Sequence, residues 1–211
     1  MIEQKLKLIK IGETYLKFDF EYNEANKERV REAYMLQIDK IGREFLNNRE
    51  FFKISIEFDQ GSLKARIVVW GTILYFGIAD YGSFRGGLRE IINDVLWFSE
   101  NVIELIDDGP NISQNDIIRT EKRTGLTGRI KELYDKIDRL ERNVNKMSNV
   151  EIQNELQQIK QEVSNLSVVL PNQDGKAFLA DLDNEYTKNL PSPDPKRVNY
   201  LWNRYGLKSE D

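Results

Sequence analysis

Residues 126–147, LTGRIKELYDKIDRLERNVNKM, carry apolar side chains at alternating steps of four and three residues. The positions that follow this spacing are Leu126, Ile130, Leu133, Ile137, Leu140, Val144 and Met147. Residues 148–170, SNVEIQNELQQIKQEVSNLSVVL, resume the spacing in a shifted phase at Ile152, Leu156, Ile159, Val163, Leu166 and Leu170. This heptad pattern is typical of a coiled-coil seam and predicts helices that pack along the apolar stripe.

The two seams do not join in phase, because Met147 and Ile152 are five residues apart. The break coincides with Ser148-Asn149-Val150-Glu151, which has the form of a capping box at the start of a helix. The pattern therefore favours two helices that fold into an antiparallel hairpin. The alternative is one bent, continuous helix with a skip in its repeat.

The part of the chain before residue 108 mixes two periodicities. Apolar residues alternate with polar ones over 16–22, 52–58 and 63–69, and Gln60-Gly61 between the last two runs predicts a hairpin turn. Helical spacing covers about 24–47, with Asn23 as N-cap, and about 84–106. We therefore predict an α+β fold, in which an antiparallel sheet packs with two amphipathic helices and is followed by a coiled-coil hairpin and a short C-terminal helical tail.

These patterns divide the chain into an α+β domain at 1–108, a linker at 109–125, the hairpin at 126–170 and a docking tail at 171–211. In the tail, a short helix is expected over 176–188, and a second helix begins with Asp194 as cap and Pro195 at its first position. Its apolar face carries Val198, Leu201, Trp202 and Tyr205. This face could dock on the chain itself or on a partner.

Composition limits the chemistry. The chain has 211 residues, a net charge of −4, no histidine and no cysteine. The commonest general base, the thiolate nucleophile and the commonest transition-metal ligands are therefore missing. Because no complete catalytic motif is present either, we predict a protein that is not an enzyme and that uses no cofactor and no metal. The negative net charge also argues against a general nucleic-acid binder.

A glycine-rich turn before the second long helix is the best small-molecule candidate in the sequence. Backbone N–H groups at such a turn can hold an anion at a helix N-terminus. The residues are Gly82, Ser83, Arg85, Gly86, Gly87 and Arg89. The spacing matches neither a P-loop nor a dinucleotide fingerprint. A turn that allows close packing is the alternative, and we favour it.

Two further groups of polar residues could be functional, but each has a simpler structural interpretation. Glu57, Asp59 and Lys64 resemble a nuclease-type grouping on adjacent strands, but the alternation places them on the polar face of an ordinary hairpin. The segment 119–129 is the most basic of the chain, through Arg119, Lys122, Arg123 and Arg129. It forms a weak basic patch without interleaved aromatic residues, so a solvated linker or a salt-bridged junction is favoured over contact with phosphate.

Three functions follow as hypotheses. The first is a non-enzymatic scaffold subunit that assembles with itself or with another protein. Its contact residues would be Leu133, Ile137, Leu140, Leu156, Ile159, Val163 and the four apolar residues of the last helix. The second is a sensor or enzyme that binds a phosphate-bearing or nucleotide ligand at Gly82–Arg89. The third is a membrane-associated component of a bacterial defence or toxin system that uses Ile67–Ala79.

The apolar run Ile67–Ala79 has thirteen residues, too few to span a bilayer, which needs about 20. The N-terminus lacks the apolar core of a signal peptide. We therefore expect a cytoplasmic protein that does not act at a membrane.

Overall fold

The computed structural model describes residues 8–19, 23–45, 53–59, 64–73, 83–107 and 114–206. Its first part is a four-stranded antiparallel sheet in the order β2-β3-β1-β4. The strands are β1 (Ile9–Phe18), β2 (Lys53–Phe58), β3 (Lys64–Gly71) and β4 (Ile117–Arg123). With helices α1 (Glu24–Phe45) and α3 (Phe84–Asp107), the chain order is that of the βαββαβ motif. The α+β fold is confirmed.

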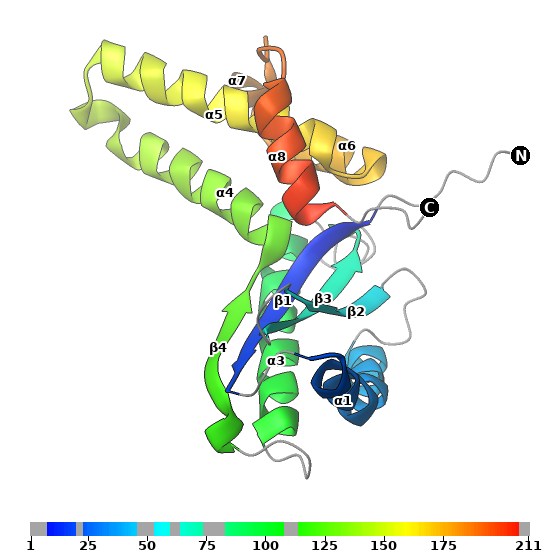
Figure 1. Cartoon of the computed structure of the whole chain (residues 1–211). Helices are drawn as coiled ribbons and strands as arrows, with labels where there is room; N and C mark the ends of the chain where they lie inside the picture. Colours follow the sequence, from blue (N-terminus) through cyan, green and yellow to red (C-terminus); the bar gives the residue numbers. More distant parts are fainter. Residues whose placement is uncertain are drawn as a thin grey trace, which may run out of the picture.

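Helices α1 and α3 cover one face of the sheet, and α3 lies along β1 (Figure 1). The residues of β1 that face α3 alternate with those that point away. Gly12 lies against Val95, because a Cβ at Gly12 would meet Val95 Cγ1 at 2.0 Å. Two residues further, Thr14 Oγ1 donates to Ser99 Oγ at 2.9 Å. Glu13 and Tyr15 therefore point to the opposite face of the sheet.

The second part of the chain forms a group of helices beyond one end of the sheet (Figure 1). These are α4 (Gly125–Asn143), the short 3-10 turn η2 (Val144–Lys146), α5 (Asn149–Val169), α6 (Asn172–Asp181), α7 (Asn184–Thr187) and α8 (Pro195–Tyr205). One hydrophobic cluster runs from the sheet through α1 and α3 into α4, α5, α6 and α8. The helical part thus shares its core with the sheet.

The predicted break between two helices is confirmed at Ser148. Ser148 Oγ accepts from Glu151 N at 3.3 Å, and Glu151 Oε2 accepts from Ser148 N at 2.7 Å, which completes the capping box. A coiled coil is not confirmed. The apolar stripe of α4 packs on β1 and α3 as well as on α5, so its heptads serve a mixed core instead of one helix–helix seam.

The structure corrects the predicted linker at 109–125. After the short turn η1 (Gln114–Asp116), residues 117–123 form β4, which pairs with β1 along its length. The sequence shows no alternation of apolar and polar residues here, because β4 lies at the edge of the sheet and carries mostly exposed charged side chains.

Other boundaries follow the predictions closely. Asn26 N donates to Asn23 Oδ1 at 2.8 Å, so Asn23 caps α1. Lys196 N donates to Asp194 Oδ1 at 2.9 Å, and Pro195 opens α8. The single helix expected over 176–188 is two, α6 and α7, because the chain is extended at Leu182 and Asp183. Phe20, Tyr22 and the turn at Gln60-Gly61 lie outside the described residues.

Candidate functional site

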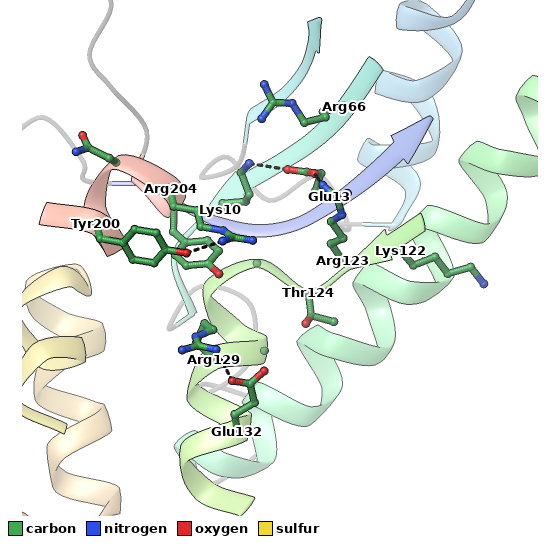
Figure 2. Close-up of a pocket in the computed structure, with 14 residues that line it drawn as sticks. Lys10, Glu13, Arg66, Lys122, Arg123, Thr124, Arg129, Glu132, Tyr200 and Arg204 are labelled. Carbon is green, nitrogen blue, oxygen red and sulfur yellow. Dashed lines mark hydrogen bonds and ion pairs between the residues drawn. The ribbon is translucent and has the colours of Figure 1, made fainter. Parts of the chain in front are cut away.

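A pocket of about 590 Å³ lies on the face of the sheet that α1 and α3 leave uncovered, where β1 meets the start of α4 and the end of α8 (Figure 2). Strands β3 and β4 supply further side chains. The lining residues are Lys10, Glu13, Arg66, Lys122, Arg123, Thr124, Gly125, Gly128, Arg129, Glu132, Tyr200, Asn203, Arg204 and Tyr205. They come from sequence positions almost two hundred residues apart, so only the fold brings them together.

A β-bulge in β1 shapes the floor of the pocket. The pairing of β1 with β3 shifts by one residue between Lys10 and Gly12. In a regular strand, residues three apart point to opposite faces, but one extra residue returns Lys10 and Glu13 to the same face. Lys10 Nζ donates to Glu13 Oε2 at 2.6 Å, and the two residues are only 6% and 4% exposed. The bulge therefore places a buried ion pair beneath the pocket.

Arg123 completes this ion network from the neighbouring strand β4. Its Nη1 donates to Glu13 Oε1 at 2.6 Å, and its guanidinium lies 4.5 Å from the centre of the Tyr15 ring. Burial alone would raise the pKa of Glu13, but the hydrogen bonds and charges of Lys10 and Arg123 outweigh it and hold that pKa below its usual value. Glu13 is therefore an ionised carboxylate between two cations.

The start of α4 forms one wall. Gly125 adopts φ +56°, and a Cβ there would lie 2.2 Å from the backbone oxygen of Lys10, so glycine is needed for the helix to approach the bulge. The N-cap residue Thr124 makes no side-chain cap hydrogen bond. Instead, Thr127 Oγ1 donates to the backbone oxygen of Ile11 at 3.1 Å and ties the helix to β1. The positive end of the α4 dipole adjoins the pocket.

The opposite wall is α8. Arg204 Nη1 donates to Tyr200 Oη at 2.5 Å, and the Arg204 guanidinium lies 5.5 Å from the Tyr205 ring centre. The hydrogen bond to Tyr200 is the main cause that raises the pKa of Arg204. In the described part of the chain, Arg204 has no carboxylate partner.

The charge of the pocket is opposite to that of the chain. Of the lining residues, Lys10, Arg66, Lys122, Arg123, Arg129 and Arg204 are cations, whereas Glu13 and Glu132 are anions, which gives a net charge of +4. The whole chain has a net charge of −4. Clustered cations in a cavity raise the local concentration of anions.

Carboxylates outside the pocket balance part of this charge. Arg66 pairs with Asp59 at 2.8 Å, and Lys122 pairs with Glu100 on α3 at 2.5 Å. Arg123 pairs with Glu121 at 2.7 Å. Within the pocket lining, Arg129 pairs with Glu132 at 2.6 Å. These ion pairs fix the orientation of the cations, and exposed pairs of this kind contribute little to stability themselves. The site is thus a preorganised set of hydrogen-bond donors. Among the described residues, no group of acidic side chains is arranged to hold a metal ion.

The predicted anion site at Gly82–Arg89 is corrected, because groups of the chain itself occupy it. Ser83 Oγ accepts from Gly86 N at 3.0 Å, and Asp181 Oδ1 accepts from Phe84 N at 3.1 Å, so α3 already has its cap and an anion. Arg85 pairs with Asp138 and lies over the Tyr134 ring. Gly87 is buried and Arg89 is exposed, while Gly82 lies outside the described residues. The packing alternative describes this turn.

The predicted protein-contact residues are placed inside the molecule. Leu133, Ile137, Leu140, Ile159, Val163, Leu201 and Tyr205 are buried, and Leu156, Val198 and Trp202 are half-buried against the core. Helix α8 docks on α5 and β1 of its own chain. Most of these side chains are therefore covered by the chain itself, and a contact with a partner through the half-buried ones stays a prediction.

The basic segment 119–129, for which we favoured a solvated linker or a salt-bridged junction, contributes to the pocket. Lys122, Arg123 and Arg129 line the pocket, while Arg119 pairs with Glu121 outside it. The sequence reasoning missed the other lining residues. A bulge and a long-range docking contact leave no periodic signal, so nothing in the sequence marked Lys10 and Arg204.

Comparisons with models of protein families, with curated proteins and with solved structures found no match. Within the described ranges, the helices are all too short or too polar to cross a membrane. Of the apolar run 67–79, residues 67–71 belong to β3 and 74–79 lie outside the described residues.

Proposed function

We propose that this protein binds a phosphate-bearing small molecule in the pocket between β1, α4 and α8. The observation that carries the proposal is that five cationic side chains from five separate elements converge on one cavity of an otherwise acidic chain. They are Lys10, Arg66, Arg123, Arg129 and Arg204, whereas the ammonium group of Lys122 pairs with Glu100 on the α3 side of the sheet. Arginine forks suit phosphate oxygens, and helix N-termini favour negative charge. This keeps the expected ligand class but moves the site from Gly82–Arg89 to the sheet.

The role is binding without catalysis. The pocket lining includes neither serine nor another side chain paired with a general base. Its one buried carboxylate, Glu13, is engaged by two cations. We therefore propose a sensor or ligand-dependent subunit. Ligand binding would change the position of the helices that share the core with the sheet.

Calorimetric titration with inorganic tripolyphosphate and with ATP tests this proposal. We expect binding by the parent protein that weakens as salt is added, because the attraction is electrostatic. Arg204→Gln and Arg129→Gln should each reduce affinity by roughly tenfold, since each removes a charge-assisted donor. Lys146→Gln, an exposed cation at the far end of the hairpin, should leave affinity unchanged. The absence of heat with both probes at low salt would contradict the proposal.

A second candidate is assembly through the tip of the helical hairpin. The end of the hairpin that contains η2 projects away from the sheet (Figure 1), and it exposes Val144 and Val150. Exposed apolar groups at a projecting tip suit a contact with a protein partner or with a second copy. Mass measurement in solution tests this, with Val150→Asp expected to lower the mass of an oligomer. A parent protein that is monomeric at all concentrations would contradict self-association.

A further inference from the structure

The pocket is larger than a phosphate group requires. Small-molecule sites commonly enclose about 300–1,000 Å³, and this cavity of about 590 Å³ lies within that range. A lone phosphate would fill only a small part of it. The remaining room needs a second chemical group, and the walls of the pocket indicate which kind.

The walls differ in character from one side to the other. Figure 2 shows Lys10, Arg123 and Arg129 on the side of β1, β4 and α4, and Tyr200 on the side of α8, with Arg204 between them. The first side offers cations that suit phosphate oxygens. The α8 side adds two aromatic rings, Tyr200 and Tyr205. This polarity matches a molecule that is anionic at one end and aromatic at the other.

Tyr200 is the aromatic residue best placed for a ligand. It is 46% exposed, whereas Tyr205 is buried against the core. The guanidinium groups of Arg197 and Arg204 lie 5.4 and 5.9 Å from the centre of its ring. Arg204 also donates to its hydroxyl. The ring is thus held in position at the pocket while nearly half of the residue stays accessible, as a stacking platform requires.

We infer that the ligand is a nucleotide, with its base stacked on Tyr200 and its phosphates held by Arg129 and Arg204. This inference rests on the proposed function, because it assigns a chemical class to the ligand of the same pocket. Arg204 is the central residue of the arrangement, since it contacts the ring of Tyr200 and carries a charge without a carboxylate partner in the described chain.

The test compares nucleoside triphosphates with inorganic tripolyphosphate by calorimetry in magnesium-free buffer. Because the two probes share the phosphate chain, their difference reports the base. We expect at least one nucleoside triphosphate to bind roughly tenfold more tightly than tripolyphosphate, in line with the usual strength of base–aromatic stacking. Tyr200→Ala should remove this difference, so that nucleoside triphosphates and tripolyphosphate bind this variant with equal affinity. Tyr200→Phe, which keeps the ring, should retain it.

The outcomes separate the two proposals. Equal affinity for tripolyphosphate and every nucleoside triphosphate, with no effect of Tyr200→Ala, would overturn the nucleotide inference and leave phosphate binding intact. Much tighter binding of a short single-stranded oligonucleotide than of any mononucleotide would also overturn it. Failure of the parent protein to bind either probe would overturn the proposed function itself.

Discussion

Lys10 and Glu13 point to the same side of β1, with Lys10 Nζ 2.6 Å from Glu13 Oε2, although they are three residues apart in a strand. The bulge between Lys10 and Gly12 makes this possible, and the approach of Gly125 to the backbone of Lys10 packs the start of α4 against the same bend. One irregularity in one strand therefore sets both the buried ion pair and the position of the helix that walls the pocket.

Replacing Glu13 with glutamine tests how much this ion network supports the fold. The change leaves buried Lys10 without a counter-charge and weakens the hold on Arg123. We expect the free energy of unfolding, measured by urea denaturation at pH 7, to fall by about 3 kcal/mol, the usual effect of breaking a buried pair. Glu24→Gln, which breaks the exposed pair with Lys27, should cost at most about 0.5 kcal/mol. Equal losses in both variants would contradict the role of Glu13.

The pH dependence of stability follows from the lowered pKa of Glu13. Its ordinary value is 4.5, and the folded protein holds it lower, so the unfolded chain binds this proton first as the pH falls. Stability from Glu13 is therefore fully present above pH 4.5 and is lost as the pH falls through the folded pKa. In urea titrations between roughly pH 6 and pH 3, Glu13→Gln should lose less stability on acidification than the parent protein. Glu151, whose pKa is also lowered, lies far from Glu13 in the sequence and is held by Ser148, so its contribution cancels in the comparison. Parallel curves would contradict this assignment.

Gly125 and Gly128 lie three residues apart on α4 and should respond differently to alanine. At Gly125 the new Cβ would meet the backbone of Lys10 and Ile11, and the positive φ strains any side chain. We expect Gly125→Ala to lower the free energy of unfolding by about 3 kcal/mol, from backbone strain and overpacking together. At Gly128 the Cβ would meet the Thr124 side chain, which can rotate, so Gly128→Ala should change stability by less than about 1 kcal/mol. A larger loss at Gly128 than at Gly125 would show that α4 does not pack on the bulge as described.

The heptad stripe also separates into two parts that mutation can distinguish. Leu133 is buried where α4 packs on the body of the protein, whereas Leu156 is half-buried on α5. Leu133→Asp places a charge in the core and should cost about 4 kcal/mol or unfold the chain, whereas Leu156→Asp should cost roughly 1–2 kcal/mol. Urea denaturation monitored by near-ultraviolet circular dichroism measures both. If Leu133→Asp altered only the oligomeric mass and left stability unchanged, the stripe would be a partner surface after all.

Local patterns in the sequence were sufficient for much of the fold. The alternation at 53–58, the apolar face of α3 and the capping box at Ser148 each depend on neighbouring residues, so they were predictable. Strand β4 was not predictable, because its pairing with β1 joins residues about a hundred positions apart and most of its side chains are polar. The pocket was harder still. Its floor depends on a bulge, and its α8 wall depends on docking, and neither leaves a periodic mark in the sequence.

The heptads show how a correct local pattern can support a wrong tertiary expectation. Spacings of four and three predict that one side of a helix is buried, and that side of α4 is buried. They do not specify what covers it. Here β1 and α3 cover much of the stripe, which we had assigned to the second helix of a hairpin or to a partner. The same reasoning explains the turn at Gly82–Arg89, where a helix N-terminus suited to an anion receives the carboxylate of Asp181.

Asp181, at the end of α6, accepts hydrogen bonds from both α3 and α4 through one carboxylate. Its removal should therefore weaken the packing of these three helices. Oδ1 accepts from Phe84 N at the start of α3, and Oδ2 accepts from the Tyr134 hydroxyl on α4 at 2.7 Å. Burial and the hydrogen bond to Asp181 raise the pKa of Tyr134, so its hydroxyl stays a donor at neutral pH. We expect Asp181→Ala to lower the free energy of unfolding by about 2 kcal/mol, because it leaves two donors without an acceptor.

Asp183 supplies the matched control for this experiment, because it is exposed at the start of α7 and makes no side-chain cap hydrogen bond. Asp183→Ala should therefore change stability by less than about 0.5 kcal/mol. A double-mutant cycle with Tyr134→Phe isolates the Tyr134–Asp181 hydrogen bond, which should give a coupling of about 1–2 kcal/mol in urea denaturation. Strictly additive losses would mean that Asp181 acts only as the cap of α3. The coupling energy thus decides whether this carboxylate links α4 to the body of the protein or serves a single helix end.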